Sequence, residues 1–259
     1  MYKGIIAPLV TPLDRSGAVS KSSLKRLINS LRGKVNALMP ALSSGEGWKL
    51  SEQQWRDVVS ATVEFAEGLP VLAGIQLPDT LDILKRSRMA MELGVDAIVV
   101  TTPFRKGLSQ DEIYGHYRAL REGSSVPLFV YNEAAISENN IELETLLRIC
   151  RLPGVVGIKE SSGSASFTRN LVARTPGVPV FQGWENLLLD SPGVDGYVMP
   201  LANLEPELCH SMLESPTPER QARINGICEQ HGLFQEDWYH GLKRELVRRG
   251  LLETDQVVS

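Results

Sequence analysis

The chain has 259 residues, 42% of them hydrophobic and 22% charged, a size that fits two small domains or one α/β barrel. A formal net charge of −4 and a pI near 5.7 provide no positive field for nucleic acid or an anionic membrane. The longest apolar stretches are strand-sized and the chain opens without a signal-peptide pattern, so we expect a cytoplasmic protein.

Short β-type runs alternate with longer amphipathic segments along the chain. Eight runs predict strands, at residues 4–10, 35–42, 71–74, 97–101, 127–131, 155–159, 178–181 and 196–198. Five amphipathic segments between them, with apolar residues at helical spacing, predict helices at residues 22–31, 51–65, 81–93, 110–121 and 143–150.

Sequence signals mark several helix ends. Ser51 is followed three residues later by Gln54, and Ser109 by Glu112, which is the pattern of an N-terminal capping box. Glycines follow the first four amphipathic segments where a C-cap belongs, at Gly33, Gly68, Gly94 and Gly123.

This alternation predicts a single (β/α)8 TIM barrel, because roughly eight strand–helix units follow one another without a Gly/Ser-rich linker. A doubly wound fold would need a phosphate-binding glycine turn after the first strand, where the chain has Pro8-Leu9-Val10-Thr11-Pro12. Two more helical segments, about 217–231 and 236–249, exceed what a barrel requires. We expect one domain, with the barrel over residues 1–215 and a short C-terminal helical appendage over residues 216–259.

A lysine ends the sixth predicted strand. Lys159 closes the run Val-Val-Gly-Ile-Lys and stands directly before Glu160. An ammonium group held against an apolar strand loses hydration, which lowers its pKa and can leave a neutral amine that attacks a carbonyl. A lysine that extends its charged end into solvent is the competing interpretation.

Other polar groups stand where a TIM barrel carries its catalytic side chains, at the carboxyl ends of the strands. Tyr131 ends the fifth strand and could carry the protons of carbinolamine formation and dehydration, or be a rim aromatic bonded to water. Ser43 and Ser44 follow the second strand. Their loop, Ser43-Ser44-Gly45-Glu46-Gly47, could hold a substrate carboxylate with backbone N–H groups and two hydroxyls, or be a plain polar connection.

The three cysteines are Cys150, Cys209 and Cys228. Their odd number and their spacing are unlike those of a metal-binding pair, so we expect reduced thiols used in packing. We expect neither a metal nor an organic cofactor.

Segments over nearly the whole chain carry a family resemblance. They are Ala7-Pro8-Leu9-Val10-Thr11-Pro12-Leu13 with Gly17, Ser43-Ser44-Gly45-Glu46, Thr102-Pro103-Phe104, Tyr131-Asn132, Gly157-Ile158-Lys159-Glu160-Ser161-Ser162-Gly163, Gly183 and Asn203-Leu204-Glu205-Pro206. In order and spacing they resemble the dihydrodipicolinate synthase/N-acetylneuraminate lyase family. The resemblance implies a (β/α)8 barrel, usually a homotetramer, whose lysine forms a Schiff base with pyruvate or another 2-oxo acid.

The same resemblance implies roles for individual residues. Lys159 is the Schiff-base lysine and Tyr131 the acid/base phenol, with Ser44 in the proton relay. Ser43 and Ser44 bind the substrate carboxylate, where the family usually has two threonines.

The chain departs from the family at two positions. The family usually carries a tyrosine after Thr102-Pro103 that enters the relay across a dimer interface, and Arg105 stands in its place, so the relay from Tyr131 through Ser44 cannot close in the usual way. Synthases of the dihydrodipicolinate type also carry an arginine for the carboxylate of aspartate semialdehyde, and Ile136 matches that position. Burying a carboxylate against isoleucine is costly, which argues against lysine biosynthesis.

Two charged residues could contact the distal half of the substrate, and each has more than one possible role. Glu133, just past Tyr131, could repel acids, bind a hydroxyl or amine, or act as a second base; a solvated loop glutamate is the alternative. Arg105 could bind an anionic distal group, or be a surface arginine paired with Glu133 or a neighbouring subunit. The C-terminal helices are shorter than is usual for the family, which could open the site.

Three functions are compatible with these residues. The first is a class I aldolase or lyase that acts on pyruvate or another 2-oxo acid through Lys159 and Tyr131. The second is a dehydratase of 2-keto-3-deoxy sugar acids that uses the same iminium with Glu133 as an extra acid. The third is a catalytically weakened, metabolite-binding paralogue. We expect a small-molecule 2-oxo acid substrate and a homo-oligomer, dimer or tetramer, with no nucleic-acid or membrane partner.

Overall fold

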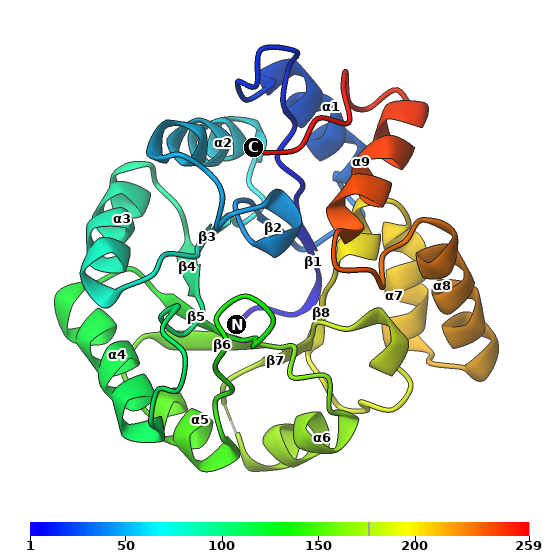
Figure 1. The fold of residues 1–259 in the computed structure, drawn as a ribbon. Coiled ribbons are helices and arrows are strands. Elements are labelled where there is room, and N and C mark those ends of the chain that lie inside the picture. Colours follow the sequence, from blue (N-terminus) through cyan, green and yellow to red (C-terminus); the bar gives the residue numbers. More distant parts are fainter. Residues whose placement is uncertain (176, 259) are drawn as a thin grey trace.

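The predicted barrel is confirmed. In the computed structural model, which describes residues 1–175 and 177–258, eight parallel strands form a ring surrounded by helices (Figure 1). The strands follow the order β2-β1-β8-β7-β6-β5-β4-β3, and a parallel bridge between Leu38 and Val71 closes the ring between β2 and β3. The strands are β1 (Gly4–Pro8), β2 (Ala37–Met39), β3 (Leu72–Ile75), β4 (Ala97–Val100), β5 (Leu128–Asn132), β6 (Val155–Glu160), β7 (Val180–Gln182) and β8 (Gly196–Val198).

Helices alternate with these strands, and short 3₁₀ turns follow three of them. The helices are α1 (Lys21–Leu31), α2 (Glu52–Phe65), α3 (Thr80–Glu92), α4 (Gln110–Gly123), α5 (Leu143–Cys150), α6 (Ala165–Arg174), α7 (Pro206–Glu214), α8 (Pro218–Gln230) and α9 (Trp238–Arg248). The turns are η1 (Ser43–Gly45) after β2, η2 (Glu185–Leu187) after β7 and η3 (Pro200–Asn203) after β8. The boundary expected at residue 215 stays a prediction; it falls between α7 and α8, and residue 259 lies outside the described residues.

Most predicted helix ends are correct. Both capping boxes form, at Ser51 with Gln54 and at Ser109 with Glu112. Gly33, Gly68 and Gly94 have positive φ angles, as C-cap glycines do. Gly123 is different, because α4 continues through it to a cap at Ser124. A Cβ at Gly123 would lie 2.8 Å from Leu84, so this glycine allows α4 to approach α3 closely.

Apolar side chains fill the inside of the barrel below its carboxyl end. The rings of Phe129 and Phe181 pack there with their centroids 5.4 Å apart. A Cβ at Gly157 would lie 2.2 Å from the Phe129 ring, so only glycine leaves room for this packing. A second, larger apolar layer lies between the strands and the helices. Open space inside the barrel is therefore left at the carboxyl ends of the strands.

The segment after α9 returns along α1 (Figure 1). The Arg26 guanidinium donates to the Leu251 carbonyl oxygen at 3.1 Å, and the Thr254 hydroxyl donates to the Leu13 carbonyl oxygen at 2.9 Å. This segment thus reaches the loop that follows β1. Across residues 1–175 and 177–258, no helix combines the length and the apolar composition needed to span a bilayer.

Candidate active site

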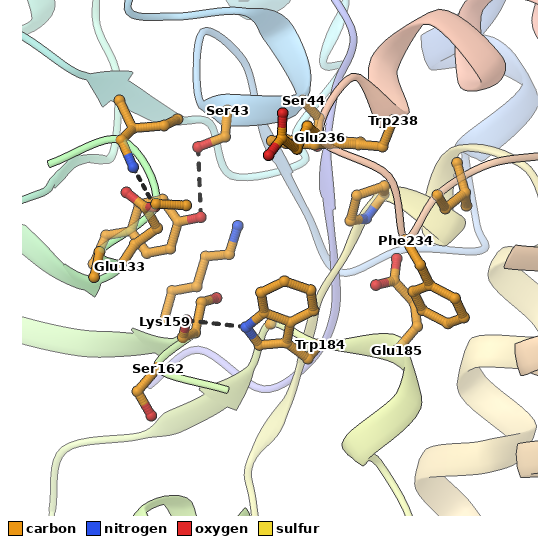
Figure 2. A pocket seen from close by; sticks show the side chains of 18 of the residues that line it. Ser43, Ser44, Glu133, Lys159, Ser162, Trp184, Glu185, Phe234, Glu236 and Trp238 are labelled. Atoms are coloured by element: carbon orange, nitrogen blue, oxygen red, sulfur yellow. Dashed lines mark hydrogen bonds between the residues drawn. The ribbon is translucent and has the colours of Figure 1, made fainter. Parts of the chain in front are cut away.

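A cavity of about 850 Å³ opens at the carboxyl ends of the strands (Figure 2). Five of the six residues that the sequence predicts for the site line this cavity: Ser43, Ser44, Tyr131, Glu133 and Lys159. They come from segments up to 116 positions apart in sequence, between Ser43 and Lys159, and the closed ring of strands brings them together. Arg105 does not line the cavity.

Lys159 lies within the cavity between Glu133 and Glu185 (Figure 2). Lys159 is the neighbour of Tyr131 in the pairing of β6 with β5, and its Nζ lies 4.2 Å from the centroid of the Tyr131 ring. The side chain is 3% exposed, and this burial lowers its pKa to about 8, against the opposing effect of Glu185 and Glu133. The neutral amine is therefore much more populated near neutral pH than that of an ordinary lysine.

The Tyr131 hydroxyl lies beside a serine. Its oxygen is 3.4 Å from Ser43 Oγ, which also accepts a hydrogen bond of 3.0 Å from Gln76 Nε2. Burial raises the pKa of Tyr131 well above its usual value, so the phenol keeps its proton at neutral pH. The family resemblance implies a relay through Ser44. The structure instead places the Ser43 hydroxyl 3.4 Å from that of Tyr131, and within the described residues no hydrogen bond joins Tyr131 to Ser44.

The loop after β2 is fixed to the barrel by its backbone. The Thr11 hydroxyl donates to the Gly45 carbonyl oxygen at 2.7 Å, and a Cβ at Gly47 would lie 2.1 Å from the Ala41 carbonyl oxygen. The backbone N–H groups of Gly45, Glu46 and Gly47 all donate within the turn. These three groups are thus unavailable to a substrate, and the side of the loop that faces the cavity is formed by Ser43 and Ser44.

Two buried carboxyl groups lie around Lys159. Glu133 Oε1 accepts a hydrogen bond of 2.8 Å from the Ile136 N–H, and its Oε2 is buried with no partner in the described part of the chain. Glu185 Oε1 accepts from the Leu201 N–H at 3.1 Å. Burial raises the pKa of both groups, that of Glu185 to about 7. Glu185 is a site residue that was not predicted from the sequence; the signal available for it was an acidic residue two positions after Gly183, past the end of the seventh strand.

Aromatic side chains form the outer part of the cavity, and we call them the aromatic wall: Trp48, Phe104, Trp184, Phe234 and Trp238. Phe234 lies between α8 and α9, and Trp238 is the first residue of α9 (Figure 2). The Trp184 indole is held by a hydrogen bond of 2.9 Å from its Nε1 to the Ser161 carbonyl oxygen. The helical appendage thus contributes side chains to the cavity.

Arg105 lies on the surface of the molecule. Its side chain is 66% exposed and forms an ion pair with Glu112 on α4. A surface ion pair was one of the two interpretations of this residue, although the partner is Glu112 and not Glu133. The position leaves the cavity without the guanidinium that an anionic distal group would require.

Comparisons with known proteins agree with this architecture. The family model described as the Dihydrodipicolinate synthetase family matches residues 1–258. A 4-hydroxy-tetrahydrodipicolinate synthase from Phenylobacterium zucineum is 32% identical over 222 residues, which are 81% of this chain and 72% of that protein.

Solved structures resemble the whole chain. Dihydrodipicolinate synthase from Bacteroides thetaiotaomicron has a TM-score of 0.90 and 29% identity, over 99% of this chain and 92% of that one. The chloride-inhibited dihydrodipicolinate synthase from Acinetobacter baumannii, complexed with pyruvate, has a TM-score of 0.90 and 25% identity, over 100% of this chain and 92% of that one. The likeness therefore includes α8 and α9 as well as the barrel.

Proposed function

Because the chain belongs to the dihydrodipicolinate synthetase family, whose enzymes are class I aldolases and lyases, we propose that its Lys159 forms a Schiff base with pyruvate or another 2-oxo acid. The observation that carries the proposal is a buried amine of lowered pKa beside a protonated phenol, in a cavity at the carboxyl end of the barrel. A similar protein, the synthase from Acinetobacter baumannii, is described in complex with pyruvate.

The chemistry begins at the neutral amine. Lys159 Nζ attacks the C2 carbonyl carbon, and the resulting carbinolamine loses its oxygen as water when Tyr131 supplies a proton. The iminium that remains withdraws electrons from C3. A C3 proton, or the C3–C4 bond of a longer substrate, can then be lost to give an enamine, and the reverse order joins C3 to an aldehyde.

The carboxylate of the 2-oxo acid has a place beside this amine. Ser43 and Ser44 present two hydroxyls to the cavity from a loop whose backbone is fixed by Thr11 and by Gly47. Hydroxyl groups can donate hydrogen bonds to a carboxylate. Because they are neutral, they shift the pKa of Lys159 less than an additional charged group would. We assign carboxylate binding to these two serines.

The distal half of the substrate is neutral in this proposal. Glu133, Glu185 and Glu236 all line the cavity, and among the described lining residues Lys159 is the one basic side chain. Ile136 also lines it, at the position where the synthase resemblance implies an arginine. An anionic distal group would find no cation here other than Lys159, which the 2-oxo group already occupies. A hydroxylated distal group can instead form hydrogen bonds with the carboxyl oxygens, and its C–H faces can pack on the aromatic wall. This argues against aspartate semialdehyde as the partner.

Dehydration of a 2-keto-3-deoxy sugar acid is the second candidate. It uses the same iminium but needs an acid to protonate a departing hydroxyl. Burial raises the pKa of Glu185 to about 7, so this carboxyl can hold a proton near neutral pH. Glu133 has a buried Oε2 with no partner in the described part of the chain, and burial raises its pKa in the same direction. A purely metabolite-binding role is disfavoured, because binding alone has no need of a desolvated amine beside a phenol.

Reductive trapping of the wild-type protein tests the proposal. Borohydride should fix an adduct on Lys159 with pyruvate and with 2-oxo acids that carry a hydroxylated chain, while a 2-oxo dicarboxylic acid should react poorly. Intact and peptide masses identify the acid and the residue. Product analysis then separates the two candidates: an aldolase releases pyruvate and an aldehyde, and a dehydratase releases water and keeps the carbon chain whole. Failure of every 2-oxo acid to form an adduct would exclude both.

Arg105→Ala should leave the KM for the substrate unchanged. The guanidinium is exposed, pairs with Glu112 and lies outside the cavity lining, so its loss should not change the contacts of a bound substrate. The measurement is KM for the best substrate of the panel, with pyruvate trapping as the reference. A raised KM with normal pyruvate trapping would contradict this prediction and indicate that Arg105 binds the distal half of the substrate.

A homo-oligomeric state, dimer or tetramer, stays a prediction.

A further inference from the structure

A buried ion pair joins the loop of Ser43 and Ser44 to the last helix. Glu46 directly follows η1, and Lys243 lies in the middle of α9, 197 positions later. Both side chains are fully buried, and Lys243 Nζ lies 2.5 Å from Glu46 Oε1. Neither residue lines the cavity, so the pair is distinct from the carboxyl groups around Lys159.

The same two side chains also hold the segment that follows α9. Lys243 Nζ donates to the Gln256 carbonyl oxygen at 2.8 Å, and the Val258 N–H donates to Glu46 Oε2 at 2.6 Å. Burial lowers the pKa of Lys243, while Glu46 opposes that change. Three parts of the chain, the turn after β2, α9 and residues 256–258, therefore meet at one buried pair of charges.

Stability alone gives little reason for this arrangement. Taking two charges out of water costs several kcal/mol per ion, and apolar residues of similar volume often do as well or better in such positions. Glu46 also has a φ of 58°, in the left-handed region that residues other than glycine seldom adopt. Such local strain persists where surrounding contacts determine the conformation, and it is frequent at functional sites.

The position of Glu46 gives the pair a function. Only Gly45 separates Glu46 from Ser44, so the direction of the two serine hydroxyls depends on how this turn is held. Thr11 holds the turn from the barrel side through the Gly45 carbonyl oxygen. On the outer side, the ion pair with Lys243 and the hydrogen bond from the Val258 N–H hold it through the Glu46 carboxylate.

We propose that Glu46 and Lys243 are positioning residues that hold Ser43 and Ser44 in the geometry that binds the carboxylate of the 2-oxo acid. The proposal rests on the function proposed above, in which the two serines bind that carboxylate. Helix α9 then contributes to both halves of the site, because its first residue, Trp238, belongs to the aromatic wall together with Phe234, which lies just before the helix.

Lys243→Met tests the proposal, because methionine fills similar space without the charge. The readout is borohydride trapping on Lys159 by two probes, pyruvate and acetaldehyde, which differ by the carboxylate. The pyruvate concentration for half-maximal trapping should rise between about 10-fold and 100-fold, as misplaced binding groups produce, while the value for acetaldehyde stays unchanged. Arg248→Gln is the matched control, because it removes an exposed guanidinium from the same helix and leaves its partner, the buried Glu245, paired with Arg249. Both probes should trap as in the wild type.

A double variant, Glu46→Gln with Lys243→Met, separates positioning from stability. It leaves no unpaired buried charge, so it should fold even where the single variant is unstable. We expect it to keep the pyruvate defect with normal acetaldehyde trapping. Normal pyruvate trapping in the folded double variant, or an equal loss for both probes, would overturn the proposal. Absence of any adduct in the wild type is a different outcome, since it rejects the Schiff base itself.

Discussion

Lys159→Ala should abolish every borohydride-trappable adduct while the barrel stays folded. The amine is the nucleophile, and among the described residues no other basic side chain lines the cavity to replace it. Removal of a desolvated amine at the mouth of the barrel should cost little stability, because burial already disfavours its charged form. The measurement is intact mass after borohydride treatment with pyruvate, together with circular dichroism to confirm folding.

The wild-type rate of trapping adds a pH test of the same residue. Only the neutral amine attacks a carbonyl, so the rate at low pyruvate concentration should rise with pH and level off above about 8, the lowered pKa of Lys159. Lys106→Ala is a matched control, because this lysine is exposed and lies outside the cavity lining. Covalent trapping of pyruvate by the Lys159→Ala protein would show that the mechanism is wrong.

Tyr131→Phe should lower turnover by roughly 10²-fold to 10⁴-fold, the range typical of general acid–base catalysis. Phenylalanine keeps the ring that packs against Lys159 but removes the hydroxyl beside Ser43. Loss of water from the carbinolamine then has no proton donor of fixed position. The measurement is the steady-state rate with the best substrate, compared with the rate of pyruvate trapping.

Tyr114→Phe serves as the control for this prediction. It removes a phenol hydroxyl from α4, where the ring is half-buried, packs against Arg148 and lies outside the cavity lining. Turnover of that variant should equal the wild-type value. If Tyr131→Phe also kept full turnover, Glu133 or a water molecule would have to carry the proton.

The local pattern of the sequence by itself determined the architecture of the barrel. Apolar runs of strand length mark β1 to β8 because strands buried on both faces tolerate few polar residues. Ser51 and Ser109 predicted helix starts correctly because a capping box is formed by residues three positions apart. Lys159 and Tyr131 could be recognised for a similar reason: each ends an apolar run, and strand ends of a barrel meet at one mouth.

Only the tertiary structure decided how the side chains around that mouth are directed. Sequence order does not tell which of two adjacent serines points at Tyr131, and the answer is Ser43 because the turn η1 sets the direction of each side chain. Arg105 could bind the substrate or form a surface ion pair on sequence grounds, and the structure pairs it with Glu112 on α4. Gly123 stays within α4 because Leu84 of the neighbouring helix packs against it.

Contacts between segments that are far apart in sequence could not be predicted from a local sequence pattern. Glu185 became part of the site when β7 and β8 placed it beside Lys159, and the segment before α9 folded back to complete the aromatic wall. Glu46 and Lys243 are far apart in sequence and have no common periodicity. Such pairs depend on the path of the whole chain, because burial of two charges is possible only where the folded structure brings both to the same enclosed place.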